Sequence, residues 1–348
     1  MKKSNFIVLF FMVLFVLPIS GLCNAQTIDE LKITVKQLEA KNKDLETKLK
    51  KLQKGKNKSA AEAEETIQQL LVENDSLWFE IENIRATEKT LAKAEADAKS
   101  VKLNIKDPVF FEYLLRFCDM DDDGNLTRWD AEHTYVIDIT RDKSLMSFIG
   151  NSNQIASIDG IENFVNLKRL VCSGNSIPQM DLSKNVLLET FIANGCGLKI
   201  LDVSKNEKLT HLECNNNLLY TVDLKDNLNL QTLDVSKNKM AAIDVSGCVK
   251  LKTLNCSGNS LTDLDVSKNV ELQTLDCSSN KISKLSFSKN TLLDNINCSN
   301  NKLTEVDVRN GIDIKFIDCS KNKDLNFVYI SKGCRVLSDK REAKTYFK

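Results

Sequence analysis

Residues 251–269 read Leu-Lys-Thr-Leu-Asn-Cys-Ser-Gly-Asn-Ser-Leu-Thr-Asp-Leu-Asp-Val-Ser-Lys-Asn, and this stretch decides the fold because its pattern recurs along the chain. One such unit is too short to bury its own apolar side, so neighbouring units must stack and share a core. The sequence predicts a solenoid over residues 145–337, with a degenerate first unit containing Leu145, Phe148, Asn153, Ile155, Ile158 and Ile161. The opening position then returns every 21 residues without an insertion, at Leu167, Leu188, Leu209, Leu230, Leu251, Leu272, Leu293 and Ile314.

Each Leu-x-x-Leu-x-Cys segment predicts a short strand, because side chains in a strand point alternately to the core and to the opposite face. Stacking places these strands side by side in one curved parallel sheet, so the predicted fold is mainly a β solenoid. The outward positions form two columns on its concave face. The first column contains Arg169, Thr190, His211, Thr232, Thr253, Thr274, Asn295 and Phe316, and the second contains Val171, Ile192, Glu213, Asp234, Asn255, Asp276, Asn297 and Asp318.

These columns are the predicted partner-binding surface, since repeat proteins present extended concave surfaces to their partners. The middle and far end are acidic and amide-rich, which suits a basic or hydroxyl-rich ligand, either a protein or a glycan. The alternative is that Ser, Thr, Asn and Asp simply make up a solvated strand face, and one aromatic residue is too little for a sugar-stacking platform. The candidate residues are His211, Glu213, Asp234, Asn255, Asp276, Asn297, Phe316 and Asp318.

A ladder of asparagines is predicted at the turn after each strand, where side-chain amides can bond backbone groups that the turn leaves unpaired. Cys196 takes the asparagine position in one unit. The ladder consists of Asn175, Asn217, Asn238, Asn259, Asn280, Asn301 and Asn322.

Six of the eleven cysteines share one inward repeat position, where a small apolar group is wanted, and we expect reduced thiols there. A disulfide or metal ladder is the alternative, but neighbouring strands lie about 4.8 Å apart whereas a disulfide wants Cβ atoms about 3.8 Å apart. Cys248 and Cys334 fall outside that position and receive no role. The six are Cys172, Cys214, Cys256, Cys277, Cys298 and Cys319.

The pattern resembles the leucine-rich-repeat family, specifically the short bacterial type whose second half reads Leu-Asp-Val-Ser-Lys-Asn. Residues 158–161, Ile-Asp-Gly-Ile, are similar to internalin repeats. The resemblance covers about residues 145 to 330. It implies a surface or secreted protein of Bacteroidetes-like bacteria that acts in adhesion and protein recognition.

Residues 1–25 have the anatomy of a signal peptide, with Lys2 and Lys3 before an apolar run from Phe6 to Leu17. The run is shorter than the roughly 20 residues of a membrane-spanning helix, so a retained anchor is the weaker alternative. We expect cleavage after Ala25 and export, with the protein secreted, at the cell surface or outer envelope, or in the periplasm. No spanning helix is expected in the mature chain.

Residues 26–100 predict a coiled coil, because apolar residues recur every seven positions. We expect a parallel dimer through residues 28–98, in which Asn42 sets the register and Lys41 faces Glu46 of the partner chain. The alternative is a hairpin within one chain, folded back at Gly55. The heptad positions are Ile28, Val35, Asn42 and Leu49 with Leu31, Leu38, Leu45 and Leu52, followed by Ile67, Asn74 and Ile81 with Leu70, Leu77, Ile84 and Leu91.

Residues 107–144 predict a small helical cap, in which Asp107 caps a helix that begins with Pro108. Its expected apolar face contains Phe111, Leu114, Leu115 and Cys118.

A loop in this cap matches the twelve-residue calcium loop of EF-hands except at the last position. Alternate carboxylates can converge on one hard cation, and Gly124 permits the sharp turn. Aspartate replaces glutamate at position twelve, and in this the loop resembles dockerin-type loops. The alternative is a solvated Asp-rich turn. Asn125 would offer its backbone carbonyl. The predicted ligands of a structural Ca²⁺ are Asp119, Asp121, Asp123, Asn125 and Asp130.

The 48 basic and 48 acidic residues cancel, so no net field gathers nucleic acid. His133 and His211 lie in no motif that pairs a histidine with a nucleophile, and no phosphate loop is present, so an enzyme is not expected. The predicted function is that of an exported binding protein with a short tail at residues 338–348. The alternative is a structural envelope or spacer protein without a specific ligand.

Overall fold

The structure is a computed structural model that describes residues 25–54, 60–141, 154–309, 314–330, 334–338 and 344–347. The expected signal segment before Ala25 lies outside these residues, as do Leu145, Phe148 and Asn153 of the degenerate first unit. The chain divides into two compact units, Met1–Val101 and Lys102–Lys348.

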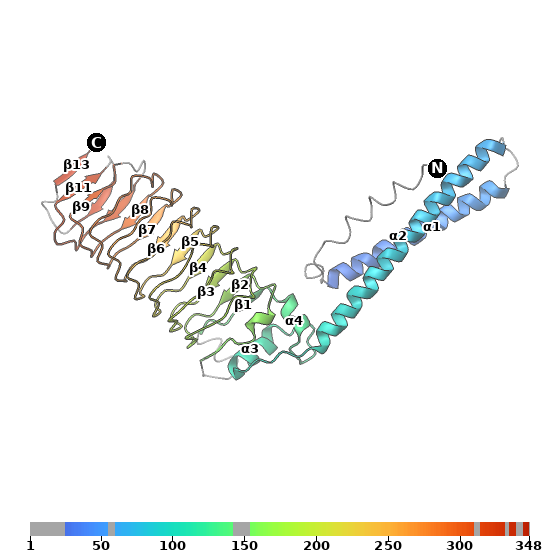
Figure 1. The fold of residues 1–348 in the computed structure, drawn as a ribbon, viewed down its shortest axis with the longest axis horizontal. Coiled ribbons are helices and arrows are strands. Elements are labelled where there is room, and N and C mark those ends of the chain that lie inside the picture. The colour runs from blue at the N-terminus through green and yellow to red at the C-terminus, as the bar shows by residue number, and fades with distance from the viewer. Residues whose placement is uncertain are drawn as a thin grey trace. The chain divides into compact units, whose positions relative to one another are not determined.

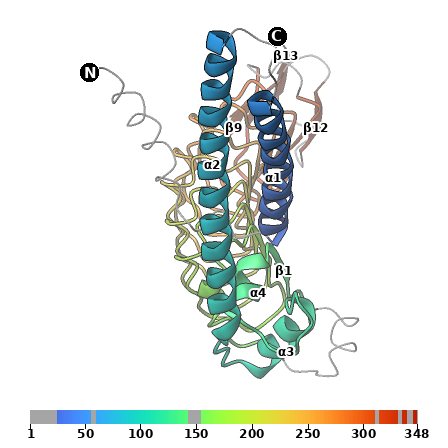
Figure 2. The same ribbon diagram turned by 90° about the vertical axis from the view of Figure 1, so that its right-hand side faces the viewer.

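The first unit is a helical hairpin made of α1 (Ala25–Lys54) and α2 (Ala60–Ser100). The helices lie side by side and run in opposite directions (Figure 2). The buried residues of the two helices are predicted heptad positions, together with Ala98 near the end of α2. The buried residues are Val35, Asn42, Leu45, Leu77, Ile81, Leu91 and Ala98.

Polar pairs between α1 and α2 show that the structure adopts the hairpin within one chain, which was the alternative to the favoured parallel dimer. The amide of Asn74 donates to Oδ1 of Asn42 over 2.7 Å. Lys41 lies 3.9 Å from Glu73 of the same chain. The dimer prediction therefore has no support in this structure, because the surface that motivated it is covered within the chain.

The second unit begins with two short helices, α3 (Pro108–Phe117) and α4 (Arg128–His133). Oδ1 of Asp107 accepts the backbone N–H groups of Val109 and Phe110, which confirms the predicted cap. The apolar face is partly different from the one expected. Phe110 is fully buried while Phe111 is exposed, because the core-facing side of α3 also includes Val109 and Tyr113.

The rest of the unit is a parallel β-solenoid whose strands follow one another in chain order (Figure 1). The predicted strands are confirmed, and one strand, β1, precedes the expected start of the solenoid at residue 145. The ten-stranded sheet contains β1 (Val136–Asp138), β2 (Arg169–Val171), β3 (Thr190–Ile192), β4 (His211–Glu213), β5 (Thr232–Asp234), β6 (Thr253–Asn255), β7 (Thr274–Asp276), β8 (Asn295–Asn297), β10 (Phe316–Asp318) and β12 (Arg335–Leu337).

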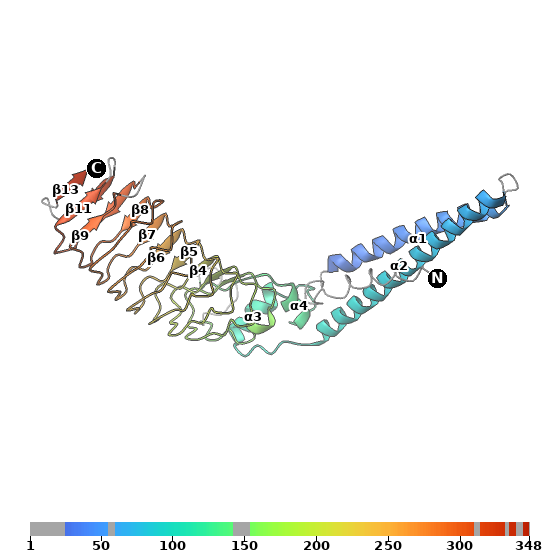
Figure 3. The same cartoon turned by 45° about the horizontal axis from the view of Figure 1, so that its top comes forward.

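A smaller parallel sheet lies at the C-terminal end of the solenoid (Figure 3). It contains β9 (Glu305–Asp307), β11 (Phe327–Ile330) and β13 (Lys344–Phe347), in the order β13-β11-β9. The last of these strands falls within the segment 338–348 that was expected to be a tail. A 3₁₀ turn, η2 (Ile161–Asn163), precedes β2.

The predicted asparagine ladder is confirmed by hydrogen bonds that join each unit to the preceding one. The amide of Asn238 donates to the carbonyls of Cys214 and Val235 over 2.9 and 3.0 Å, and its Oδ1 accepts the N–H of Leu219. Cys196 takes over part of this role, since its Sγ donates to the carbonyl of Cys172 at 3.2 Å. Each ladder residue thus pairs buried backbone groups that would otherwise be costly.

A second asparagine ladder, not foreseen from the sequence, occupies the end of each Leu-Asp-Val-Ser-Lys-Asn segment. For example, Asn269 donates to the carbonyls of Val245 and Cys248. Cys248 itself takes the place of an asparagine in this ladder, and its Sγ lies 3.9 Å from the carbonyl of Leu224. Cys248, one of the two cysteines without an assigned role, is therefore a ladder residue. The asparagines are Asn185, Asn206, Asn227, Asn269 and Asn290.

The cysteines of the predicted inward column are buried free thiols, as expected. Burial raises the pKa of Cys214 and Cys256 well above the ordinary range, which keeps the thiols protonated and unreactive. Burial also raises the pKa of Cys248 to about 11.

Candidate binding face and calcium loop

The ten-stranded sheet aligns the predicted binding residues in two columns, which we call the sheet face (the outward residues of β2–β8 and β10). Backbone pairing places His211 beside Thr232 and Glu213 beside Asp234, and this register continues to Phe316 and Asp318. The middle residue of each strand points into the core, whereas its two neighbours are mostly half-buried. The structure thus brings together all eight predicted partner-binding residues.

The carboxylates of the second column are held by hydrogen bonds. Oδ1 of Asp234 accepts the N–H of Ser236 at 2.9 Å, and its Oδ2 accepts the amides of Asn215 and Asn255 at 3.2 and 3.3 Å. The same pattern returns two strands further on, where Asp276 accepts the N–H of Ser278 and the amide of Asn297. These contacts fix the direction in which each carboxylate points.

His211 and Glu213 form a pair at the near end of this column. Nε2 of His211 lies 2.8 Å from Oε1 of Glu213, and the amide of Asn194 donates to Oε2 at 2.9 Å. Burial alone would raise the pKa of Glu213, but the hydrogen bonds from Asn194 and His211 outweigh it, and the pKa is lowered. Glu213 is therefore anionic on the sheet face at neutral pH.

The ends of the columns include residues that sequence reasoning missed. Asp138 of β1 aligns with Val171 and so begins the second column, but β1 lies before the recognisable repeats and carries no repeat signal. At the other end, the guanidinium of Arg335 lies 6.0 Å from the ring centre of Phe316. The aromatic residue expected to meet a partner therefore has a cationic neighbour within the chain.

The calcium-type loop lies between α3 and α4, and three of its five predicted ligands come together. Carboxylate oxygens of Asp119, Asp121 and Asp123 lie within 4.8 Å of one another. Oδ2 of Asp119 accepts the N–H of Gly124, whose φ of 78° is the left-handed conformation that the sharp turn requires. Leu126 is buried, as expected for the residue that pins the loop.

The side chains of the two remaining predicted ligands have other partners, although the ligand atom expected of Asn125 is its backbone carbonyl. Asp130 is fully buried, and its carboxylate accepts the hydroxyl and N–H of Thr127 and the N–H of Met120. It therefore caps the start of α4. Oδ1 of Asn125 accepts Nζ of Lys102 at 2.6 Å. The carboxylates at loop positions one, three and five fit a hard cation, whereas the carboxylate at position twelve, Asp130, caps α4.

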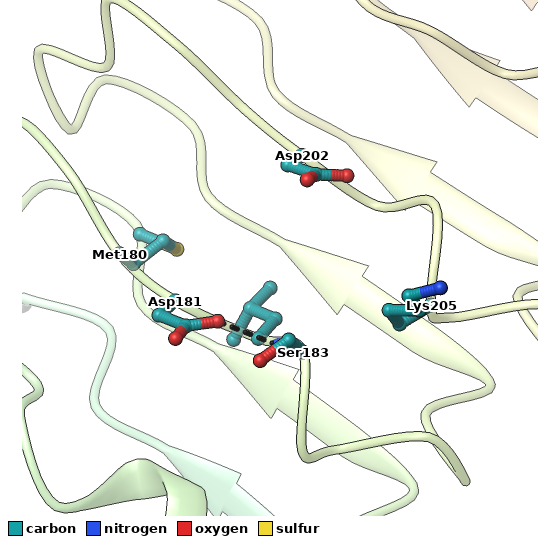
Figure 4. Close-up of a pocket in the computed structure, with 6 residues that line it drawn as sticks. Met180, Asp181, Ser183, Asp202 and Lys205 are labelled. Atoms are coloured by element: carbon teal, nitrogen blue, oxygen red, sulfur yellow. Dashed lines mark hydrogen bonds between the residues drawn. The ribbon is translucent and has the colours of Figure 1, made fainter.

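A pocket of about 240 Å³ lies among the turns in the second half of the repeats rather than on the sheet face (Figure 4). Oδ1 of Asp181 accepts the N–H of Ser183 over 2.8 Å, and this backbone hydrogen bond is the main cause of its lowered pKa. Asp202 and Lys205 line the opposite side. The lining contains no histidine or cysteine that would pair a nucleophile with a base.

Among the described residues, no helix is long and apolar enough to cross a membrane.

The fold and its sheet face define a parallel β-solenoid built from stacked short repeats. Residues 228–269 match the family model described as Leucine Rich repeats (2 copies). Over these residues, and in the InlJ structure described below, the solenoid is similar to leucine-rich-repeat proteins. No enzyme family is indicated, and no curated protein matches the chain.

One similar solved structure is the functional domain of InlJ from Listeria monocytogenes, which includes a cysteine ladder. It is 28% identical, with a TM-score of 0.54, and the match covers 70% of this chain and 59% of that chain. This chain thus matches less than two thirds of the InlJ domain. A leucine-rich-repeat protein of Leptospira interrogans is 19% identical with a TM-score of 0.42, covering 53% of this chain and 60% of that chain.

Proposed function

We propose that this chain is an exported scaffold that binds a protein partner through the sheet face. The carrying observation is the in-register array of half-buried polar side chains between His211 and Asp318, whose carboxylates are already oriented by hydrogen bonds. A surface that is ordered before binding loses less conformational entropy when a partner arrives. Export is inferred from the signal-peptide anatomy of residues 1–25, and the short bacterial repeat type from the Leu-Asp-Val-Ser-Lys-Asn segments.

Oligomerisation by the helical region is not part of this proposal, because α2 covers the heptad seam of α1. The rival function is a spacer, in which the same polar residues only keep the sheet solvated. A spacer tolerates charge reversal on the sheet face, whereas a binding scaffold does not.

A random-peptide display library tests the proposal. The full chain is the bait, and selected peptides are re-tested on Asp276→Lys, which reverses one charge on the sheet face. Asp263→Lys, at an exposed position in the second half of the neighbouring repeat, is the matched control. We expect the selected peptides to lose binding to Asp276→Lys alone. If no sequence is enriched, or if both variants bind equally, recognition through the sheet face is wrong.

We also infer that the loop between α3 and α4 binds a structural Ca²⁺ through the carboxylates of Asp119, Asp121 and Asp123 and the backbone carbonyl of Asn125. The three converging carboxylates and the left-handed Gly124 support this inference. Asp130 would order the loop by capping α4 rather than act as a ligand. A bound cation would offset the mutual repulsion of the carboxylates.

Thermal unfolding with and without calcium tests this site. A ligand present at about ten times its Kd stabilises the folded state by about 1.4 kcal/mol, so calcium should raise the unfolding temperature. Asp121→Asn should remove most of that rise. Asp122→Asn is the control, because Asp122 is outside the cluster and asparagine tolerates its positive φ. Equal calcium responses in the two variants would show that the cluster is only a solvated turn.

A further inference from the structure

From β5 to β10, carboxylates occupy every second strand of the second column of the sheet face. Glu213, on β4 directly beside Asp234, precedes this alternation. Asp234 lies on β5, Asp276 on β7 and Asp318 on β10, while Asn255 and Asn297 occupy the strands between them. Neighbouring strands lie about 4.8 Å apart, so consecutive carboxylates are about 9.6 Å apart along the solenoid. This part of the column therefore presents negative charges at a regular spacing.

These carboxylates are oriented and keep capacity for a partner. Each accepts the N–H of a serine two residues later at 2.9 Å, and intervening asparagine amides bond Asp234 and Asp276. Within the described part of the chain, no lysine or arginine forms an ion pair with any of the three. Because a carboxylate has about four acceptor positions and Asp234, which accepts the most, accepts three hydrogen bonds, each retains at least one position for a cationic donor.

The spacing discriminates between peptide conformations. A polyproline II segment rises about 3.1 Å per residue with three residues per turn, so every third side chain lies on one edge about 9.3 Å from the last. Same-face residues of a β-strand recur at about 6.7 Å, and the seventh residue of an α-helix recurs at about 10.5 Å. Over the two intervals from Asp234 to Asp318, the polyproline II repeat stays within about 1 Å of register, and the α-helix drifts by about 2 Å.

The neighbouring column supplies what such a segment needs besides charge. A polyproline II backbone has no internal hydrogen bonds, so its carbonyls require donors from the surface on which they lie. The first column offers hydroxyls at Thr232, Thr253 and Thr274, one on each of three adjacent strands. All three threonines are half-buried, so they lie in the floor of the face rather than project from it.

We propose that the sheet face from β5 to β10 binds a basic segment in the polyproline II conformation with lysine or arginine at every third position. This inference rests on the proposed function, since it names the chemistry of the partner at the same face. The cationic side chains pair with Asp234, Asp276 and Asp318, and the peptide carbonyls accept hydrogen bonds from the threonine hydroxyls.

The test measures binding of two synthetic peptides to the full chain by fluorescence anisotropy. One peptide has four Lys-Pro-Pro triplets, and the other has the same composition with its lysines in adjacent pairs. We expect the triplet peptide to bind at least about fivefold more tightly, and to weaken as salt screens the pairs. Asp276→Asn, which preserves shape and removes one charge, should weaken the triplet peptide about fivefold, whereas Asp263→Asn should leave it unchanged.

The outcomes separate this inference from the proposed function. Equal binding of the two peptides, or of the triplet peptide to both variants, overturns the three-residue spacing. If display selection nevertheless yields peptides that depend on Asp276, the sheet face binds partners of another conformation and the proposed function stands. If neither the triplet peptide nor any selected peptide depends on Asp276, both proposals fail.

Discussion

The helical hairpin and the solenoid both have periodic sequences, but only in the solenoid does the period predict which segments pack against each other. In the solenoid, each unit packs against the next unit along the chain, so Leu254 of β6 lies between Leu233 of β5 and Leu275 of β7. In the hairpin, the heptad pattern identifies an apolar seam but not which helix covers it. A sequence repeat therefore predicts specific contacts when each unit packs against the next unit along the chain. Otherwise it predicts only which face of a helix is apolar.

Asn42 in the hairpin and Asn238 in the solenoid show that the contacts of an asparagine are predictable in one region and not in the other. Asn42 was expected to set the register of a parallel dimer, and it instead bonds Asn74 of the same chain. Asn238, by contrast, makes the backbone contacts that its repeat position predicted. The difference arises because a ladder asparagine bonds backbone at fixed offsets, whereas a heptad asparagine bonds whatever polar group the other helix presents.

The largest expected effect is a twofold difference in the mass of the chain in solution, which distinguishes a monomer from a dimer. We expect a chain of residues 26–348 to be a monomer, because α2 already covers the seam of α1. Light scattering measures the mass, beside the same chain shortened to residues 105–348. A dimeric mass that becomes monomeric on shortening would restore the parallel dimer and make the hairpin wrong.

Matched leucine deletions test whether the two regions are stabilised independently. Leu254→Ala removes a fully buried side chain from the solenoid core and should lower its free energy of unfolding by about 3 kcal/mol. Leu77→Ala should destabilise only the hairpin, because the regions are separate compact units. Peptide-resolved hydrogen exchange reads each region by itself. Faster exchange in the solenoid caused by Leu77→Ala would show that the regions are coupled.

Much of the solenoid could be predicted from its 21-residue spacing, including the strands, the two columns and the first asparagine ladder. The first strand could not, because Val136 and Ile137 precede the repeats and show no spacing of their own. Loop spacing also does not reveal that the carboxylate of Asp130 accepts three hydrogen bonds from Met120 and Thr127. Ladder roles such as that of Cys248 appear only when the carbonyls around a residue are known.

Cys248 offers a smaller test of the claim that repeat position determines contacts. Cys248→Asn should change the stability of the solenoid by less than about 1 kcal/mol. Its amide would reach two carbonyls as those of Asn227 and Asn269 do, whereas Sγ reaches only that of Leu224, but its buried Oδ1 would have no partner, as in those two residues. Urea unfolding measures the change. The same substitution in the inward column, Cys256→Asn, should destabilise by about 2 kcal/mol, because it buries an amide among apolar residues. Equal effects of the two substitutions would contradict the second ladder.

The smallest expected effect concerns the pH dependence of the sheet face. The hydrogen bonds from Asn194 and His211 lower the pKa of Glu213 in the folded state below its unfolded value. The unfolded state therefore binds more protons in acid, and this carboxylate contributes stability above about pH 4.5 that is lost as the pH falls through the folded pKa. Solvent screening at this partly exposed position limits the contribution to about 0.5 kcal/mol.

Urea unfolding between about pH 6 and pH 3 measures this contribution. Glu213→Gln should reduce the loss of unfolding free energy between these two pH values by about 0.5 kcal/mol. Glu189→Gln, on an exposed side chain whose carboxylate lies 3.7 Å from Lys168, is the control for the loss of one negative charge. Because both substitutions remove one carboxylate from the solenoid, a difference between them reports the local hydrogen bonds of Glu213 rather than the change in net charge. Identical curves would mean that the sheet face does not hold Glu213 in the folded protein as the structure has it.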